Sequence, residues 1–191
     1  MRYVLGVIGM IILGVIAVIL FARMLTHQNH QVQVGHVDAN MTDYINDKSE
    51  VEFVQYGQVV GNEQYRTLKI YVSQNQRKIE LLKTYEGEVE RSESFTNNYD
   101  AYNSFMRSLS NAGFTRKQVS NVTDPTGLCP TGMRYSYILQ NDGKDVSNLW
   151  NTSCLPLGGS LGNNGATIRQ LFQRQIPDYS VFMKGVSFSG Q

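Results

Sequence analysis

A serine set among glycines is the residue in this chain that most resembles a catalytic nucleophile. Gly158, Ser160 and Gly162 match the pattern G-x-S-x-G, which in α/β-hydrolases holds the serine on a tight turn between a strand and a helix. Such a serine needs a histidine base later in the chain, and no histidine follows His36. We therefore interpret the match as accidental and residues 155–165 as a flexible glycine-rich loop. This loop leads into a helix and could cradle an anion, but a plain cap at Asn164 explains the pattern more simply.

Three carboxylates form a second candidate group. Glu86, Glu88 and Glu90 alternate along a predicted strand. Paired carboxylates can act as general acid and base or bind a cation. The simpler interpretation is a solvated strand edge whose charges discourage aggregation.

Three histidines follow the first hydrophobic segment. His27 and His30 are close enough in sequence to share a metal ion, with His36 nearby. Histidines in a polar segment without a fourth ligand are usually solvated. We therefore predict no catalytic, cofactor-binding or metal-binding residue, and no cofactor.

The chain has two cysteines, Cys129 and Cys154, which bracket a predicted hairpin turn at residues 141–144 almost symmetrically. Positions equidistant from a hairpin turn face each other, so we predict a disulfide at the open end of the hairpin. Two separate buried thiols are the alternative. A disulfide closing a loop of this length would contribute about 3–4 kcal/mol in the chain-entropy model. Such bonds persist outside the cytosol, so the pair predicts an extracytoplasmic domain.

Residues 3–22 contain no charged side chain and lie between Arg2 and Arg23. Twenty residues in a helix span roughly 30 Å, the thickness of a bilayer's hydrocarbon core. We predict a single-pass signal anchor in the cell membrane, with a cleaved signal peptide as the alternative. The flanking arginines hardly orient it, so sidedness depends on the predicted disulfide.

Small residues lie on one face of this predicted transmembrane helix, namely Gly6, Gly9, Gly14 and Ala17. They would allow a homodimer through the transmembrane helix, although small residues are common in such helices and no strict G-x-x-x-G is present.

The remaining pattern predicts an α+β fold. We expect an anchor over residues 1–24, a juxtamembrane linker over 25–50 and one extracytoplasmic domain over 51–191. Alternating or β-branched stretches predict strands at residues 51–60, 66–73, 78–89, 133–140, 146–153 and a last one at 179–188. Helices are predicted from a cap at Asn97 or Asn98 to Gly113, and over residues 166–176. This order implies a mostly antiparallel sheet of about five to six strands with two helices on one face.

The charge balance limits the partners. Seventeen basic residues face 16 acidic ones, so the chain lacks the broad basic surface of a nonspecific nucleic-acid binder. We predict a bilayer contact through residues 3–22, no nucleic acid, and a surface protein or wall polymer as partner.

Several stretches across residues 61–179 resemble an uncharacterised family of short, single-pass membrane-anchored exported proteins of small-genome bacteria. The stretches are residues 61–66, 97–105, 112–114, 129–137, 149–154 and 168–179. The resemblance implies an anchored extracytoplasmic domain with a paired cysteine, and it implies no activity. The sequence thus predicts a cell-surface binding or structural module rather than an enzyme. Two alternatives stay open: an envelope hydrolase with paired carboxylates, and a small-ligand or lipid-binding domain.

Overall fold

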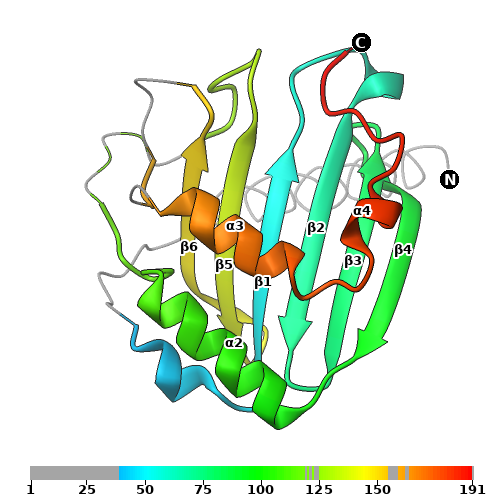
Figure 1. Ribbon diagram of the computed structural model, residues 1–191. Coiled ribbons are helices and arrows are strands. Elements are labelled where there is room, and N and C mark those ends of the chain that lie inside the picture. Colours follow the sequence, from blue (N-terminus) through cyan, green and yellow to red (C-terminus); the bar gives the residue numbers. More distant parts are fainter. Residues whose placement is uncertain are drawn as a thin grey trace, which may run out of the picture. The chain divides into compact units, whose positions relative to one another are not determined.

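A six-stranded antiparallel sheet forms the centre of the protein (Figure 1). The computed structural model describes residues 39–190 except 119, 121, 123–124, 155–158 and 162–163. The strand order is β4-β3-β2-β1-β5-β6. The strands are β1 (Ser49–Tyr56), β2 (Arg66–Ser73), β3 (Gln76–Lys83), β4 (Glu88–Thr96), β5 (Arg134–Asn141) and β6 (Lys144–Thr152).

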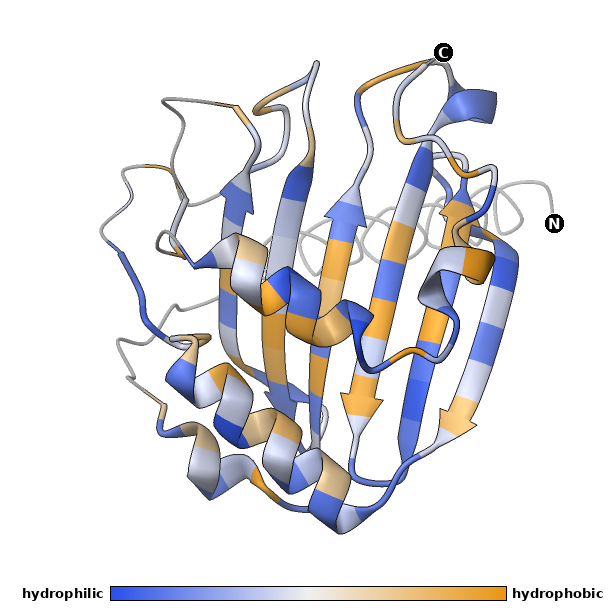
Figure 2. Ribbon diagram, in the orientation of Figure 1, coloured by the Kyte–Doolittle hydropathy of each residue, from blue (hydrophilic) through white to orange (hydrophobic). Residues whose placement is uncertain are grey.

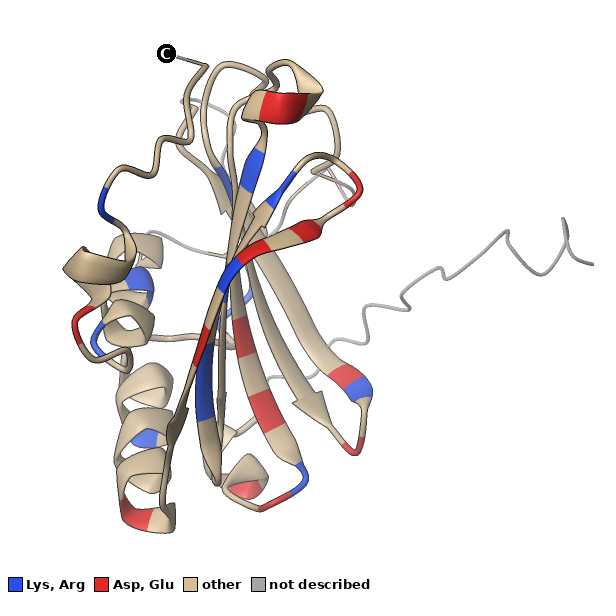
Figure 3. Cartoon of the chain, turned by 90° about the vertical axis from the view of Figure 1, so that its right-hand side faces the viewer, with Lys and Arg blue, Asp and Glu red and all other residues tan. Residues whose placement is uncertain are grey.

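Among the described residues, three α-helices and two 3₁₀ helices accompany the sheet. They are α2 (Tyr99–Asn111), α3 (Gly165–Gln173), the short α4 (Tyr179–Phe182), η1 (Met41–Tyr44) and η2 (Asn62–Gln64). These three α-helices, α2, α3 and α4, lie on one side of the sheet (Figure 3). The predicted mostly antiparallel α+β domain is therefore confirmed in its sheet and in its helical layer.

The hydrophobic core lies between the sheet and the α-helices. Phe53 of β1 pairs with Ile70 of β2 and with Tyr137 of β5, and all three side chains are fully buried. The apolar residues of β2 alternate with polar ones, as Figure 2 shows, so one face of the strand turns to the helices. Phe172 of α3 packs 5.7 Å from the Phe53 ring, measured between centroids.

The predicted caps of helix α2 are confirmed. Asn98 Oδ1 accepts a hydrogen bond from the Ala101 amide at 2.9 Å, which satisfies a free donor in the first turn. At the other end Gly113 has a φ of +78°, and the Phe114 amide donates to the Leu109 carbonyl at 3.0 Å. This is the glycine-terminated Schellman arrangement, and it buries Phe114.

Two predicted strands are wrong. Residues 78–89 do not form one strand: β3 ends at Lys83, and a turn containing Thr84 and Gly87, both with positive φ, leads into β4. Strand β4 carries few apolar residues because it lies at the sheet edge, so it lacks the alternation that marks a half-buried strand. The closing strand predicted at 179–188 is instead α4 followed by a turn at Gly185, where φ is +78°.

Other boundaries differ by a few residues. The first strand ends at Tyr56 instead of residue 60, and the second helix is α3, which ends at Gln173. Within the predicted linker, Ala39 and Met41 are buried in the core. None of the helices in the described part of the chain is long and apolar enough to cross a membrane. The anchor predicted at residues 3–22 lies outside the described residues.

Candidate binding face

The sheet face turned away from the α-helices carries a cluster of aromatic and charged side chains. We call it the helix-free face. It comprises Glu50, Glu52, Val54, Tyr56, Lys69, Tyr71, Lys78, Glu80, Arg134 and Trp150. These residues alternate along their strands with the core residues, so the strand pleat itself gathers them. In Figure 3 no described α-helix lies on this side of the sheet.

Tyr71 of β2 lies at the centre of this face. The Nζ atoms of Lys69 and Lys78 lie 5.9 Å and 5.8 Å from its ring centroid, which is within cation–π range. Register explains the placement, since Tyr71 pairs with Lys78 on β3 and with Glu52 on β1. The ring is only partly exposed.

Carboxylates balance the two lysines. Lys78 Nζ lies 2.6 Å from Glu80 Oε1, and Lys69 Nζ lies 3.3 Å from Glu52 Oε1. The second contact is within ion-pair distance, so the Lys69 charge stabilises the Glu52 carboxylate. Two ion pairs of the helix-free face therefore flank the Tyr71 ring.

A second aromatic–cation pair lies nearer the ends of β1 and β5. The Arg134 guanidinium lies 5.5 Å from the Tyr56 ring centroid, and the two residues are direct cross-strand partners. Val54 and Trp150 lie beside this pair and are buried. The accessible part of the face therefore consists of the half-buried rings and the charged side chains, and aromatic residues and arginine are enriched at protein contact surfaces.

Burial sets the ionisation of this face. It raises the pKa of the Tyr71 hydroxyl to about 12, and the nearby Glu52 carboxylate adds to that rise. Burial also raises the pKa of Tyr56 and of Glu50, the latter helped by repulsion from Glu52. Burial lowers the pKa of Lys69, but Glu52 and Tyr71 outweigh it, so the net pKa is raised. The tyrosines therefore stay neutral and Lys69 stays charged at neutral pH.

The predicted disulfide is confirmed. Cys129 and Cys154 are bonded, with their Cα atoms 5.7 Å apart, at the open end of the β5–β6 hairpin. Gly132 lies against the bond, and a Cβ atom there would approach Cys129 Sγ to 2.5 Å. The cysteines are structural residues of this domain.

Ser160 has a structural role as well. It is buried, and its Oγ accepts a hydrogen bond from the Trp150 amide at 3.0 Å. A hydroxyl used in this way at the edge of β6 is poorly placed as a nucleophile. Gly158 and Gly162 of the same pattern lie outside the described residues, as do the three histidines.

The turn before β4 contains Glu86, whereas Glu88 and Glu90 lie on β4 itself. Glu86 is exposed. Its pKa is lowered mainly by a hydrogen bond with its own main chain, and further by hydrogen bonds with the side chains of Thr84 and Asn62. Glu88 and Glu90 each have a basic partner, Lys83 at 3.3 Å and Arg66 at 2.5 Å. Across the described residues no group of three or more histidine, cysteine or acidic side chains could hold a metal ion.

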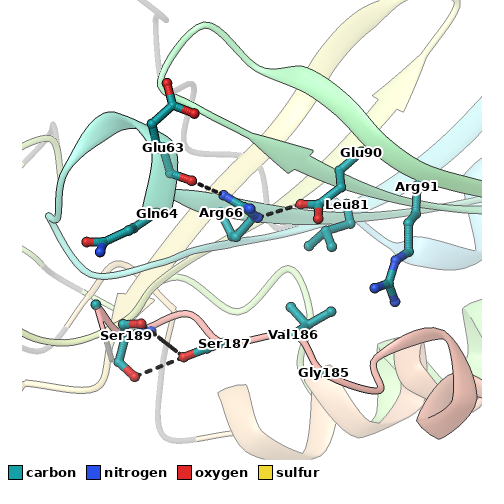
Figure 4. A pocket seen from close by; sticks show the side chains of 11 residues that line it. Glu63, Gln64, Arg66, Leu81, Glu90, Arg91, Gly185, Val186, Ser187 and Ser189 are labelled. Atoms are coloured by element: carbon teal, nitrogen blue, oxygen red, sulfur yellow. Dashed lines mark hydrogen bonds and ion pairs between the residues drawn. The ribbon is translucent and has the colours of Figure 1, made fainter.

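A polar pocket of about 220 Å³ lies between β4, η2 and the C-terminal segment (Figure 4). Arg66, Glu90 and Arg91 line one side, and Ser187 and Ser189 line the other. Arg66 donates to the Glu63 carbonyl at 2.7 Å, and Figure 4 shows the Glu63 carboxylate pointing away from Glu90. Arg91 donates to the Phe182 carbonyl at 2.7 Å. The charged groups of this pocket thus hold the C-terminal segment and each other.

No family model matches this chain, and no curated protein sequence matches it.

Sequence reasoning found part of the helix-free face. In a strand over residues 66–73, as predicted, Lys69 and Tyr71 lie on the same face because they are two positions apart. The strand pattern did not identify Lys78 or Glu52 as their neighbours. Those contacts depend on the pairing of three strands, which single-strand alternation does not specify.

Proposed function

We propose that this chain is a membrane-anchored extracytoplasmic binding module whose helix-free face contacts a partner at the cell surface. One observation carries the proposal: rings and paired charges gather on the sheet face that the described α-helices leave uncovered. Half-buried tyrosines offer contact area at low entropic cost, and they are frequent at binding hot spots.

The disulfide supports the extracytoplasmic placement. Paired cysteines are rare in a reducing cytosol and persist in exported proteins. The uncharged run over residues 3–22 supports a single-pass anchor in the cell membrane. The resemblance to short anchored exported proteins points the same way.

The balance of charge on the helix-free face limits the kind of partner that we expect. Lys69, Lys78 and Arg134 are matched by the same number of carboxylates, Glu50, Glu52 and Glu80. A balanced face gives no long-range attraction for a polyanion. We therefore expect a surface protein or an uncharged wall polymer, and no nucleic acid.

The alternatives receive less support from the geometry. For a hydrolase, the pocket offers Glu63 and Glu90, but the second is ion-paired with Arg66 and the first points away. A general acid usually needs an unpaired carboxyl with a raised pKa. The described pocket is also largely polar, which differs from the apolar cavity of a typical lipid-binding site.

Binding of the full-length protein to isolated envelope fractions tests the proposal. The protein would be reconstituted in detergent micelles and mixed with purified wall polymer and, separately, with surface-protein extract. Tyr71→Ala should weaken retention by one fraction at least fivefold, because it removes the central ring. Tyr99→Ala is the matched control, since Tyr99 is 52% exposed on α2, which lies on the opposite side of the sheet. Equal binding by both variants, or no binding by the unmodified protein, would contradict the proposal.

Sidedness needs its own measurement. Intact cells would be treated with a membrane-impermeant reductant and then with a membrane-impermeant maleimide. Labelling of Cys129 and Cys154 is expected if the domain lies outside. Labelling only after cell lysis would place it inside.

A further inference from the structure

The two edge strands of the sheet, β6 and β4, differ in how their outer sides are covered. At the β6 edge, Trp150 uses both main-chain groups: its amide donates to Ser160 Oγ at 3.0 Å and its carbonyl accepts from the Leu161 amide at 3.0 Å. At the opposite edge, every residue of β4 except Phe95 is exposed, and no described strand pairs with its outer side. The register of β4 against β3 shifts at Glu90, and beyond this bulge Arg91–Thr96 form a regular free edge, which is a ready template for another strand.

The charges along β4 are only partly matched within the domain. Glu88 pairs with Lys83 and Glu90 pairs with Arg66. Arg91 and Glu93 form no ion pair with any residue in the described part of the chain, although Arg91 donates to the Phe182 and Lys184 carbonyls. They lie two residues apart on the helix side of the sheet, opposite Leu81 and Ile79 of β3. In Figure 3 this edge faces the viewer, and its acidic and basic residues follow one another along the strand.

We propose that a second copy of this chain pairs with the outer edge of β4, with the two β4 strands antiparallel and Ser92 opposite Ser92 on a two-fold axis. Antiparallel pairing about an axis perpendicular to the sheet keeps each residue on its own face. In this register Arg91 lies opposite the partner's Glu93, and Glu93 lies opposite the partner's Arg91. Both unmatched charges of each copy are then neutralised across the dyad.

Neighbouring registers lack this match. Centring the pair on Arg91 places that cation opposite itself, and centring it on Glu93 places two carboxylates opposite each other. Like charges directly opposite destabilise a strand pair. The interface is narrow, so the dimer belongs to the weak, transient class of association. It uses a surface apart from the helix-free face and from the predicted transmembrane helix, and it does not depend on what the helix-free face binds.

Cysteine cross-linking of the full-length chain in detergent micelles tests the register. In Ser92→Cys the two introduced thiols face each other at roughly 4.5–5.5 Å between Cα atoms, within reach of a disulfide. Ser94→Cys is the matched control, because Ser94 is equally exposed on the same face of β4. In the proposed register the two Ser94 positions lie roughly 13 Å apart along the strands.

Under mild oxidation Ser92→Cys should give at least fivefold more covalent dimer than Ser94→Cys. Mass mapping should find the bond between the two introduced cysteines, with Cys129–Cys154 intact in each copy. Equal yields from the two variants, or no dimer from Ser92→Cys, would overturn the proposal.

Charge reversal tests the contacts. Glu93→Arg should raise the dimer dissociation constant about tenfold, measured by analytical ultracentrifugation, because it sets cation against cation twice across the dyad. Adding Arg91→Glu should restore the affinity. Unchanged association in Glu93→Arg would place the contact elsewhere, such as the transmembrane helix, and refute the β4 dimer. Should the double variant prove unstable, the cross-linking yields of Ser92→Cys and Ser94→Cys still test the β4 dimer.

Discussion

The side chain of Asn164 donates a hydrogen bond from Nδ2 to the Ala112 carbonyl, at 3.0 Å across 52 positions of sequence. Asn164 was expected to cap helix α3, which follows it directly, but its side chain makes no capping hydrogen bond there. It satisfies a carbonyl at the C-terminal end of α2 instead. The bond joins the end of one helix to the start of another, so one side chain helps fix how the helical layer packs.

Asn164→Asp should therefore destabilise the domain even though aspartate is an excellent N-cap residue. The carboxylate cannot donate to Ala112, and it would bring a negative charge to the negative end of the α2 dipole. We expect a loss of about 1 kcal/mol in the free energy of unfolding, measured by urea denaturation. If Asn164 acted only as the cap of α3, the variant would be as stable as the parent.

Gly132→Ala should also destabilise the domain, through the disulfide. A Cβ atom at Gly132 would lie 2.5 Å from Cys129 Sγ, 2.6 Å from Ser153 Oγ and 2.9 Å from Cys154 Sγ. The sulfur atoms cannot rotate away while they are bonded, and Ser153 Oγ is held by a 2.8 Å hydrogen bond from the Met133 amide. The expected cost is about 1–3 kcal/mol, typical of overpacking.

A double-mutant cycle separates this clash from a backbone effect. In a Cys129→Ser, Cys154→Ser background, Gly132→Ala should cost less, because serine side chains are smaller and free to rotate. The background itself should lose about 3–4 kcal/mol, as estimated for a loop closed over 25 positions. An equal cost of Gly132→Ala in both backgrounds would contradict the proposed role of the disulfide.

The hydrogen bond that caps α2 leads to a further prediction about stability. Asn98→Ala removes the acceptor for the Ala101 amide and should cost about 1 kcal/mol in thermal or urea unfolding. Asn97→Ala is an informative comparison, because Asn97 Nδ2 donates to the Ser73 carbonyl, outside the helix. Asn98→Asp should retain the stability of the parent, since aspartate also accepts from that amide. A loss in Asn98→Asp as large as in Asn98→Ala would rule out capping as the cause.

The parts of the fold that could be predicted from the sequence are those fixed by short-range sequence pattern. The ends of α2 follow from Asn98 and Gly113, and the β5–β6 hairpin follows from Asp142-Gly143 between alternating strands, so short-range pattern was sufficient there. Strand β4 escaped prediction because an edge strand need not bury one face. The neighbours of Tyr71 on the helix-free face were not predicted, for a different reason. Glu52, Tyr71 and Lys78 meet only after β1, β2 and β3 pair in one register.

The pH dependence of stability should show the burial of Glu50. Its pKa is raised above 4.5 by burial and by repulsion from Glu52, with Lys78 acting in the opposite direction. The folded state therefore keeps this proton to a higher pH than the unfolded state does. Since stability falls with pH wherever the folded state binds more protons, Glu50 should destabilise the domain progressively as the pH rises from its ordinary pKa through its raised one.

Glu50→Gln removes this titration and provides the measurement. The variant should unfold at higher urea than the parent at pH 7, and the difference should disappear below about pH 4, where the carboxyl is protonated in both states. The low-pH limit serves as the internal control, because the glutamine and the protonated glutamate are nearly isosteric. A Glu50→Gln variant that is less stable at pH 7, or that keeps the same advantage at every pH, would mean that the Glu50 carboxylate stabilises the sheet or that the effect is not electrostatic.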